Sequence, residues 1–160
     1  MATPRWRRSP APRPEYWSVS LRLKRVLGLG VILALVGGGC DSGGRLGAQA
    51  LSQQSKSLQS EAAEGALLAQ DAASGRTTRI YTRKHSSELS RVASQAAGTL
   101  KAAKTAPALE ATVRQLSVLA GQVSADLKRL AGASRDQDRA LARELRAAAQ
   151  ASQKIGEGLK

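Results

Sequence analysis

The chain has 160 residues, about one domain's worth, and carries 25 Lys and Arg against 12 Asp and Glu, a net charge of +13. Residues 1–39 hold seven of the basic residues and one acidic residue, so +6 of this charge lies in a short segment. Residues 45–160 contain one Tyr, one His and no Cys. This composition excludes a disulfide-stabilised domain. The uneven charge argues against reading the whole chain as a nucleic-acid-binding domain.

The first part of the chain has the layout of an export signal. Residues 1–25 are basic and broken by proline, and residues 26–36 form an uncharged apolar run. Eleven helical residues span about 16 Å, roughly half of a membrane's hydrocarbon core. This length is typical of a signal peptide rather than a transmembrane helix, and the preceding positive charge directs the downstream chain outward. We predict a signal peptide over residues 1–39, with its n-region at 1–25 and its h-region at 26–36.

Small residues and a cysteine follow the apolar run, in the order Gly37-Gly38-Gly39-Cys40, and Cys40 is the single cysteine of the chain. This arrangement resembles the lipobox of bacterial lipoproteins; Gly38 and Gly39 fit the pattern, whereas Gly37 stands where Leu is usual. The resemblance implies that the Cys40 thiol receives diacylglycerol and that the preceding peptide is removed. It also implies an extracytoplasmic protein, lipid-anchored at the outer face of the cytoplasmic membrane. Residues 40–44 are then the lipidated cysteine and a short tether.

The remainder is expected to be helical, because residues 45–160 contain 26 Ala, one Pro and few β-branched or aromatic residues. We predict four helices, at about 45–74, 77–104, 107–131 and 135–159. Breaks are indicated by Gly75, by Pro107, and by Ser134 with Gln137, which form a capping-box pattern.

Each predicted helix carries an apolar stripe with heptad-like spacing. The third is the most regular and the fourth repeats it, whereas the second is looser and the first is the least regular. In chain order the four stripes are Ala48, Leu51, Ser55, Leu58, Ala62, Gly65 and Ala69; Tyr81, His85, Leu89, Val92, Ala96, Leu100 and Ala103; Leu109, Val113, Leu116, Ala120, Val123, Leu127 and Leu130; and Leu141, Leu145, Ala148, Ser152, Ile155 and Leu159.

Short connections between these helices favour an all-α fold, an up-down-up-down antiparallel four-helix bundle. The alternative is a long helical coiled-coil hairpin that completes its core by forming a homodimer. Gly65, Gly98 and Gly121 lie inside predicted helices, and close approach of neighbouring helices would compensate for their low helix propensity.

Tyr81 and His85 form the first candidate site, because both lie on the predicted apolar stripe of residues 77–104. One interpretation is a small-ligand or metal site in an internal cavity, and the simpler one is a hydrogen-bonded histidine in a wide part of the core. We predict no metal site, because the Glu-x-x-His motifs of di-iron bundles are missing from the sequence.

Arg76, Arg79, Arg83 and Lys84 form the densest basic cluster of the helical part and are the second candidate site. Its functional interpretation is contact with anionic lipid headgroups near the anchor, and its simpler interpretation is a solvated helix face. Arg139, Arg143 and Arg146 form a second basic row that we interpret as solvated.

No catalytic residues are predicted, because the sequence holds no phosphate-binding glycine loop, no GxSxG motif and no thiol besides Cys40. Glu61 and Glu64 are interpreted as part of an exposed helix side. Tyr81 is the one aromatic residue available for stacking after residue 44, so nucleic acid is not an expected partner. The sequence therefore predicts a non-enzymatic lipoprotein without a cofactor other than its lipid, acting as an interaction or scaffold domain for another envelope protein. The alternatives are a ligand or metal binder using Tyr81 and His85, and an anionic membrane-surface binder.

Overall fold

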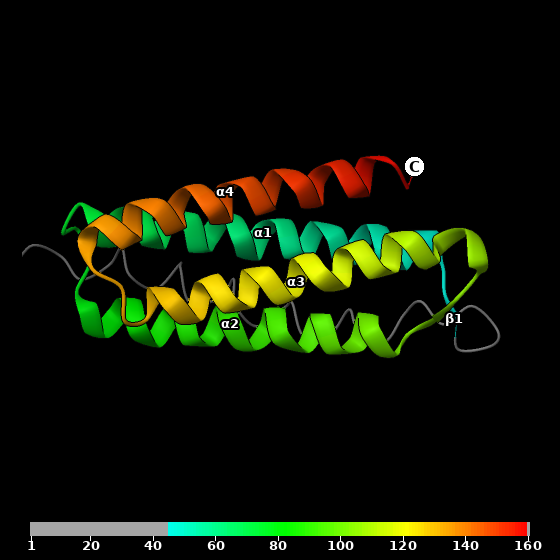
Figure 1. Ribbon diagram of the computed structural model, residues 1–160, viewed down its shortest axis with the longest axis horizontal. Helices are drawn as coiled ribbons and strands as arrows, with labels where there is room; N and C mark the ends of the chain where they lie inside the picture. The colour runs from blue at the N-terminus through cyan, green and yellow to red at the C-terminus, as the bar shows by residue number, and fades with distance from the viewer. Residues whose placement is uncertain (1–44, 160) are drawn as a thin grey trace, which may run out of the picture. The chain divides into compact units, whose positions relative to one another are not determined.

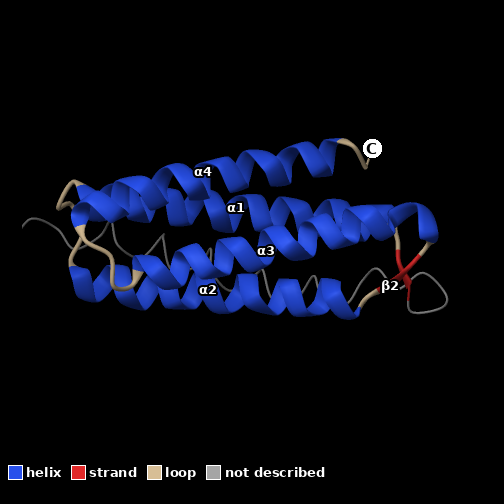
Figure 2. Ribbon diagram, in the orientation of Figure 1, coloured by secondary structure: helices blue, strands red, loops and turns tan. Residues whose placement is uncertain are grey.

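The structure, a computed structural model, describes residues 45–159, which form an all-α bundle. Cys40 and the predicted signal peptide and tether lie outside these residues. Figure 1 shows the four helices side by side, and Figure 2 shows two short strands at one end. The elements are β1 (Arg45–Leu46), α1 (Ala48–Ala73), α2 (Arg79–Ala102), β2 (Lys104–Thr105), the 3-10 turn η3 (Pro107–Leu109), α3 (Glu110–Leu130) and α4 (Arg135–Glu157).

The helices alternate in direction along the chain, and α4 returns toward the end at which α1 begins (Figure 1). The predicted up-down-up-down antiparallel bundle is therefore confirmed. The closest neighbours are α1 with α4 and α2 with α3, whereas α1 with α2 and α3 with α4 are packed more loosely. A long hairpin would contain the same two close pairs. In a hairpin, α1 would continue straight into α2 and α3 straight into α4. Here the chain reverses direction at both of these connections, so the α1–α4 pair packs against the α2–α3 pair.

Local sequence signals explain where the chain turns. Gly75 adopts a positive φ of 70°, a conformation that glycine reaches without a Cβ clash, and it ends α1. Thr78 caps α2 by accepting from the Tyr81 backbone N–H at 3.3 Å. The predicted capping box of α4 is present, with the Ser134 backbone N–H donating to Gln137 Oε1 at 2.8 Å. These breaks prevent α1–α2 and α3–α4 from continuing as two long helices.

Leucine, valine and alanine side chains fill the core along the helix stripes. The predicted stripe of α3 is confirmed from Val113 to Leu130, since each member is at most 6% exposed. The stripes of α1 and α4 are confirmed in their central parts, and serines and alanines let these two helices come close together. Ser152 Oγ donates to the Ser55 backbone carbonyl at 2.7 Å, which satisfies a buried hydroxyl across the α1–α4 contact.

The glycines inside the helices differ in what surrounds them. A Cβ on Gly65 would lie 2.6 Å from Leu127 Cδ2 and 3.3 Å from Leu145 Cδ1, so this position needs glycine for close helix packing. Gly98 and Gly121 would each have nothing within 4 Å of an added Cβ. The expectation of close helix approach is therefore correct for Gly65 and wrong for Gly98 and Gly121.

Two strands of two residues each join the start of α1 to the α2–α3 connection. They run parallel, with Arg45 opposite Lys104 and Leu46 opposite Thr105, and Thr105 Oγ1 donates to the Leu46 carbonyl at 3.0 Å. We predicted helix from residue 45, whereas α1 begins at Ala48. The pairing fixes the entry of the chain into the bundle beside the α2–α3 connection (Figure 2).

Candidate functional site

His85 is held at the surface between α1 and α2. Its Nε2 lies 2.7 Å from Glu64 Oε1 on α1, and its Nδ1 lies 3.8 Å from Glu88 Oε2 on its own helix. The Tyr81 ring stacks on the imidazole with a centroid distance of 5.5 Å and an interplanar angle of 20°. The His85 side chain is 24% exposed, between Glu64 at 49% and Glu88 at 55%. Tyr81, His85, Glu64 and Glu88 thus form one cluster, here called the α1–α2 surface cluster.

The expected internal cavity around Tyr81 and His85 is wrong, because Tyr81 is 56% exposed and His85 is only partly buried. The buried side of α2 is rotated from the predicted stripe and contains Thr82, Ser86 and Ser90. Each hydroxyl has a hydrogen-bond partner. Thr82 Oγ1 donates to the Thr78 carbonyl at 3.0 Å, Ser86 Oγ donates to the Arg83 carbonyl at 3.2 Å, and Ser90 Oγ lies 3.4 Å from Ser124 Oγ. Because their hydroxyls are hydrogen-bonded, these small polar residues can be buried. They face the core in the positions that we predicted for Tyr81 and Val92.

Glu61 is buried next to this cluster, which corrects the expectation that it lies on an exposed side of α1. It is 9% exposed; its Oε1 accepts from Ser57 Oγ at 3.2 Å, and its Oε2 has no partner in the described residues. Burial, partly offset by the Ser57 hydrogen bond and reinforced by the nearby Glu64 charge, raises the pKa of Glu61 to about 6. Glu64 is exposed as expected. Beside the cluster, α1 therefore carries a buried carboxylate whose pKa is raised toward neutral pH.

The chemistry available to the α1–α2 surface cluster is hydrogen bonding, ion pairing and aromatic contact. Within residues 45–159 no three His, Cys, Asp or Glu side chains come together in an arrangement that could hold a metal ion. Tyr81 and His85 are brought together, as their spacing in the sequence predicts, but they face solvent. A ligand at these residues would therefore lie on the surface and contact the Glu64 and Glu88 carboxylates.

The four residues of the predicted basic cluster have different surroundings. Arg76 Nη2 pairs with Asp71 at 2.7 Å, and Arg79 forms two bonds, of 3.2 and 2.7 Å, with the Asp138 carboxylate. Asp138 is fully buried, whereas the Arg79 side chain is 44% exposed. The Asp138 hydrogen bonds raise the pKa of Arg79. Arg79 thus joins α2 to α4, a role that sequence reasoning missed because the two residues are 59 positions apart.

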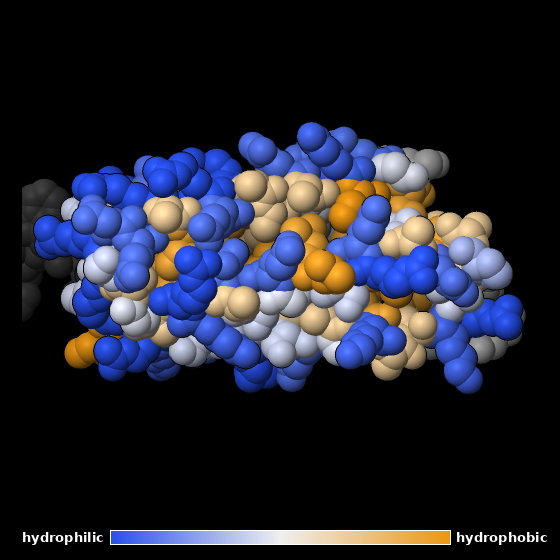
Figure 3. All heavy atoms as spheres, in the orientation of Figure 1, coloured by the Kyte–Doolittle hydropathy of each residue, from blue (hydrophilic) through white to orange (hydrophobic). Residues whose placement is uncertain are grey.

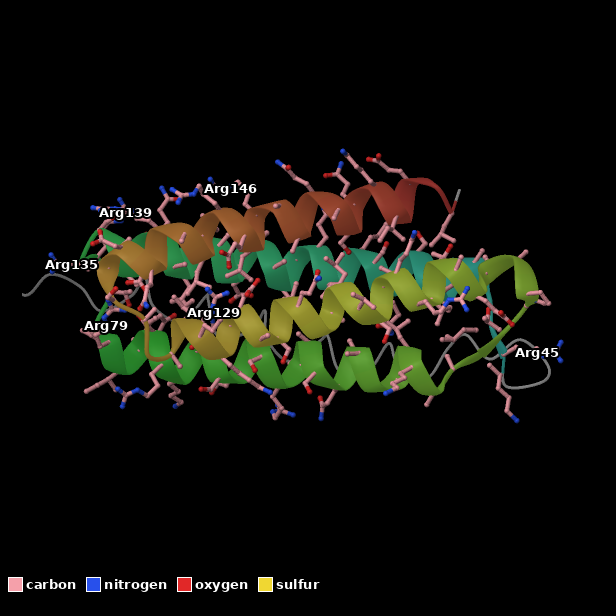
Figure 4. The ribbon with its side chains drawn as sticks, viewed as in Figure 1. Arg45, Arg79, Arg129, Arg135, Arg139 and Arg146 are labelled. Carbon is pink, nitrogen blue, oxygen red and sulfur yellow. The ribbon has the colours of Figure 1, made fainter. Side chains whose placement is uncertain are left out.

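Arg83 and Lys84, the other two members, are exposed, and neither forms an ion pair with another described residue. Figure 4 shows Arg79, Arg135 and Arg139 at one end of the bundle and Arg45 at the other. Because α1 has 26 residues, the two ends are about 39 Å apart. The basic cluster therefore lies at the end of the bundle opposite Arg45, and Cys40 itself is outside the described residues.

No helix among the described residues is both long enough and apolar enough to cross a membrane. Figure 3 shows hydrophobic side chains between α3 and α4, and mostly hydrophilic side chains at the end that bears Arg135 and Arg139. Comparison with known proteins found no matching protein-family model, no similar curated protein and no similar solved structure.

Proposed function

We propose that this chain is an extracytoplasmic lipoprotein, anchored in the membrane through diacylglycerol on Cys40, whose helical bundle is a non-enzymatic interaction domain for another envelope protein. The anchor is supported by the order of basic segment, apolar run, small residues and lone cysteine. Four residues lie between Cys40 and Arg45, so the five Cα–Cα steps from one to the other cover at most about 17 Å even when fully extended. The tether therefore holds the β1 end of the bundle close to the membrane surface.

The interaction role rests on one observation, the incompletely buried apolar stripe of α2. Tyr81, His85, Glu88 and Val92 follow one another at spacings of four, three and four residues and so share one side of the helix. Tyr81 is 56% exposed and Val92 is 39% exposed. A helix of a partner protein laid along this side would cover both apolar side chains, and the Glu88 carboxylate between them would meet a basic residue of the partner.

Fatty-acid labelling of cells tests the anchor. The wild-type chain is expected to take up label and the Cys40→Ser variant is not, because the variant lacks the thiol that is acylated. Equal labelling of both chains would refute the anchor.

Site-specific crosslinking tests the interaction surface. A photoreactive residue at position 92 is expected to join the chain to a discrete membrane-dependent partner band, and Tyr81→Asp should abolish this band. The matched control is Ala147→Asp on α4, which also places a charge at an exposed position and should leave the band unchanged. A band that survives Tyr81→Asp, or is equally lost with Ala147→Asp, would refute this surface.

A further inference from the structure

A groove lies between the second half of α2 and the first half of α3, at the end of the bundle where Arg45 enters. Its volume is about 920 Å³, which lies within the range of small-molecule binding clefts. Leu100 and Val113, exposed by only 2% and 6%, form part of its lining. Val118, which is exposed, adds a further apolar side chain, and small residues such as Ala97, Gly98, Ala103, Ser117 and Gly121 complete this part of the lining. The groove thus has an apolar base and is open to solvent.

Four cationic side chains line this groove against a single carboxylate. They are Arg45, Lys101, Lys104 and Arg114, and the carboxylate is Glu110. The parallel pairing of β1 and β2 places Arg45 directly opposite Lys104, an arrangement that is unfavourable for two like charges. Among residues 45–159 none of the four cations forms an ion pair, whereas Arg76, Arg79, Arg129 and Arg139 each do. The groove therefore has an excess of positive charge that an anionic ligand would neutralise.

Gly98 and Gly121 line the groove from α2 and α3, respectively, and keep it open. Glycine within a helix is less favourable than alanine, and helix packing explains its presence at Gly65. At Gly98 and Gly121 an added Cβ would meet nothing within 4 Å, so helix packing does not explain them. Larger side chains at these two positions would project into the space that a ligand would occupy.

We propose that this groove binds an anionic membrane phospholipid, with the phosphate among Arg45, Lys104 and Arg114 and the first carbons of an acyl chain against Leu100 and Val113. The combination of several cations with an apolar base distinguishes an anionic amphiphile from a free phosphate ion, which has no apolar part. The inference rests on the proposed anchor for access to the membrane, because the tether from Cys40 brings this end of the bundle within about 17 Å of the lipid.

Native mass spectrometry of the full-length chain in an uncharged detergent tests the proposal. The probes are dihexanoylphosphatidylglycerol, dihexanoylphosphatidylcholine and glycerol 3-phosphate. Phosphatidylglycerol is expected to bind at least tenfold more tightly than the other two. Equal binding of phosphatidylcholine would overturn the role of charge, and equal binding of glycerol 3-phosphate would replace the lipid site by a phosphate site.

Two variants locate the binding. Lys104→Glu combined with Arg114→Glu should weaken phosphatidylglycerol binding at least tenfold. Arg143→Glu combined with Arg146→Glu, the control, makes the same change of charge on α4, far from the groove, and should leave binding unchanged. Gly98→Leu combined with Gly121→Leu should block binding without altering charge, and it decides the question if the charge variant does not fold. Equal losses in the control, or full binding by the glycine variant, would overturn the proposal.

The anchor and the groove can fail separately. The Cys40→Ser chain is expected to bind short-chain phosphatidylglycerol as tightly as the wild type, because the groove contains no part of the anchor. Loss of fatty-acid labelling with retained lipid binding in this variant is the result that both proposals predict. Labelled wild-type chain that fails to bind phosphatidylglycerol would overturn the groove and leave the anchor standing.

Discussion

Replacing the buried Glu61 by glutamine should stabilise the bundle at neutral pH. The carboxylate is 9% exposed, and one of its oxygens has no partner among the described residues. Its pKa is raised from 4.5 to about 6, a change equivalent to about 2 kcal/mol. Glutamine has nearly the same shape and cannot ionise, so Glu61→Gln should be more stable than the wild type by up to about 2 kcal/mol at pH 7.

The sign of the pH dependence follows from this shift. Because the pKa of Glu61 is higher in the folded state, folded protein binds more protons than unfolded protein between pH 4.5 and 6. The stability of the wild type should therefore decrease as pH rises through this window and level off above pH 6. Burial also raises the pKa of Asp126, with the same sign, but both proteins retain Asp126 and its effect cancels in their difference.

Urea denaturation followed by circular dichroism at pH values from 4 to 8 measures this difference. The curves of wild type and Glu61→Gln should meet near pH 4 and separate by pH 6. Glu88→Gln is the control, because its side chain is 55% exposed and its replacement should change stability by no more than about 0.5 kcal/mol. Parallel curves for wild type and Glu61→Gln, or a destabilised variant at pH 7, would refute the reasoning.

Three further predictions concern the packing of the bundle, and chemical denaturation measures each. Arg79→Ala should lower the stability of the bundle by about 3 kcal/mol, because it leaves the fully buried Asp138 without its cation. Asp138→Asn should lower stability by less, because the Arg79 side chain that it leaves unpaired is half-exposed. Equal losses of stability in the two variants would contradict this asymmetry. Gly65→Ala should destabilise by about 1–3 kcal/mol through contact with Leu127, and Gly98→Ala should stabilise by up to about 1 kcal/mol; changes of the same sign would count against the packing described. Leu116→Asp should lower stability by several kcal/mol because it buries a charge, and an unchanged midpoint would show that this position is not in the core.

The candidate site was only partly predictable. The i, i+4 spacing of Tyr81 and His85 is enough to bring them together on one helix, and the structure shows them stacked. Nothing local shows that Glu64 lies across from His85, because the contact joins two helices. The groove could have been suspected from Gly98 and Gly121, two glycines inside predicted helices. Its cationic lining depends on the pairing of Arg45 with Lys104, which are 59 positions apart in the chain.

The sequence alone determined the number of helices, their approximate ends and the buried side of α3. These properties follow from hydrogen bonds between near neighbours, from the helical repeat and from residues such as Gly75 and Ser134 that end or begin a helix. Tertiary structure decided the rotation of α2 and the burial of Glu61. Each depends on the surface of a neighbouring helix. Small hydroxyl side chains that form their own hydrogen bonds pack more closely against that surface than Tyr81 would. The spacing of apolar residues within one helix does not describe the surface of its neighbour, so it could not predict this packing.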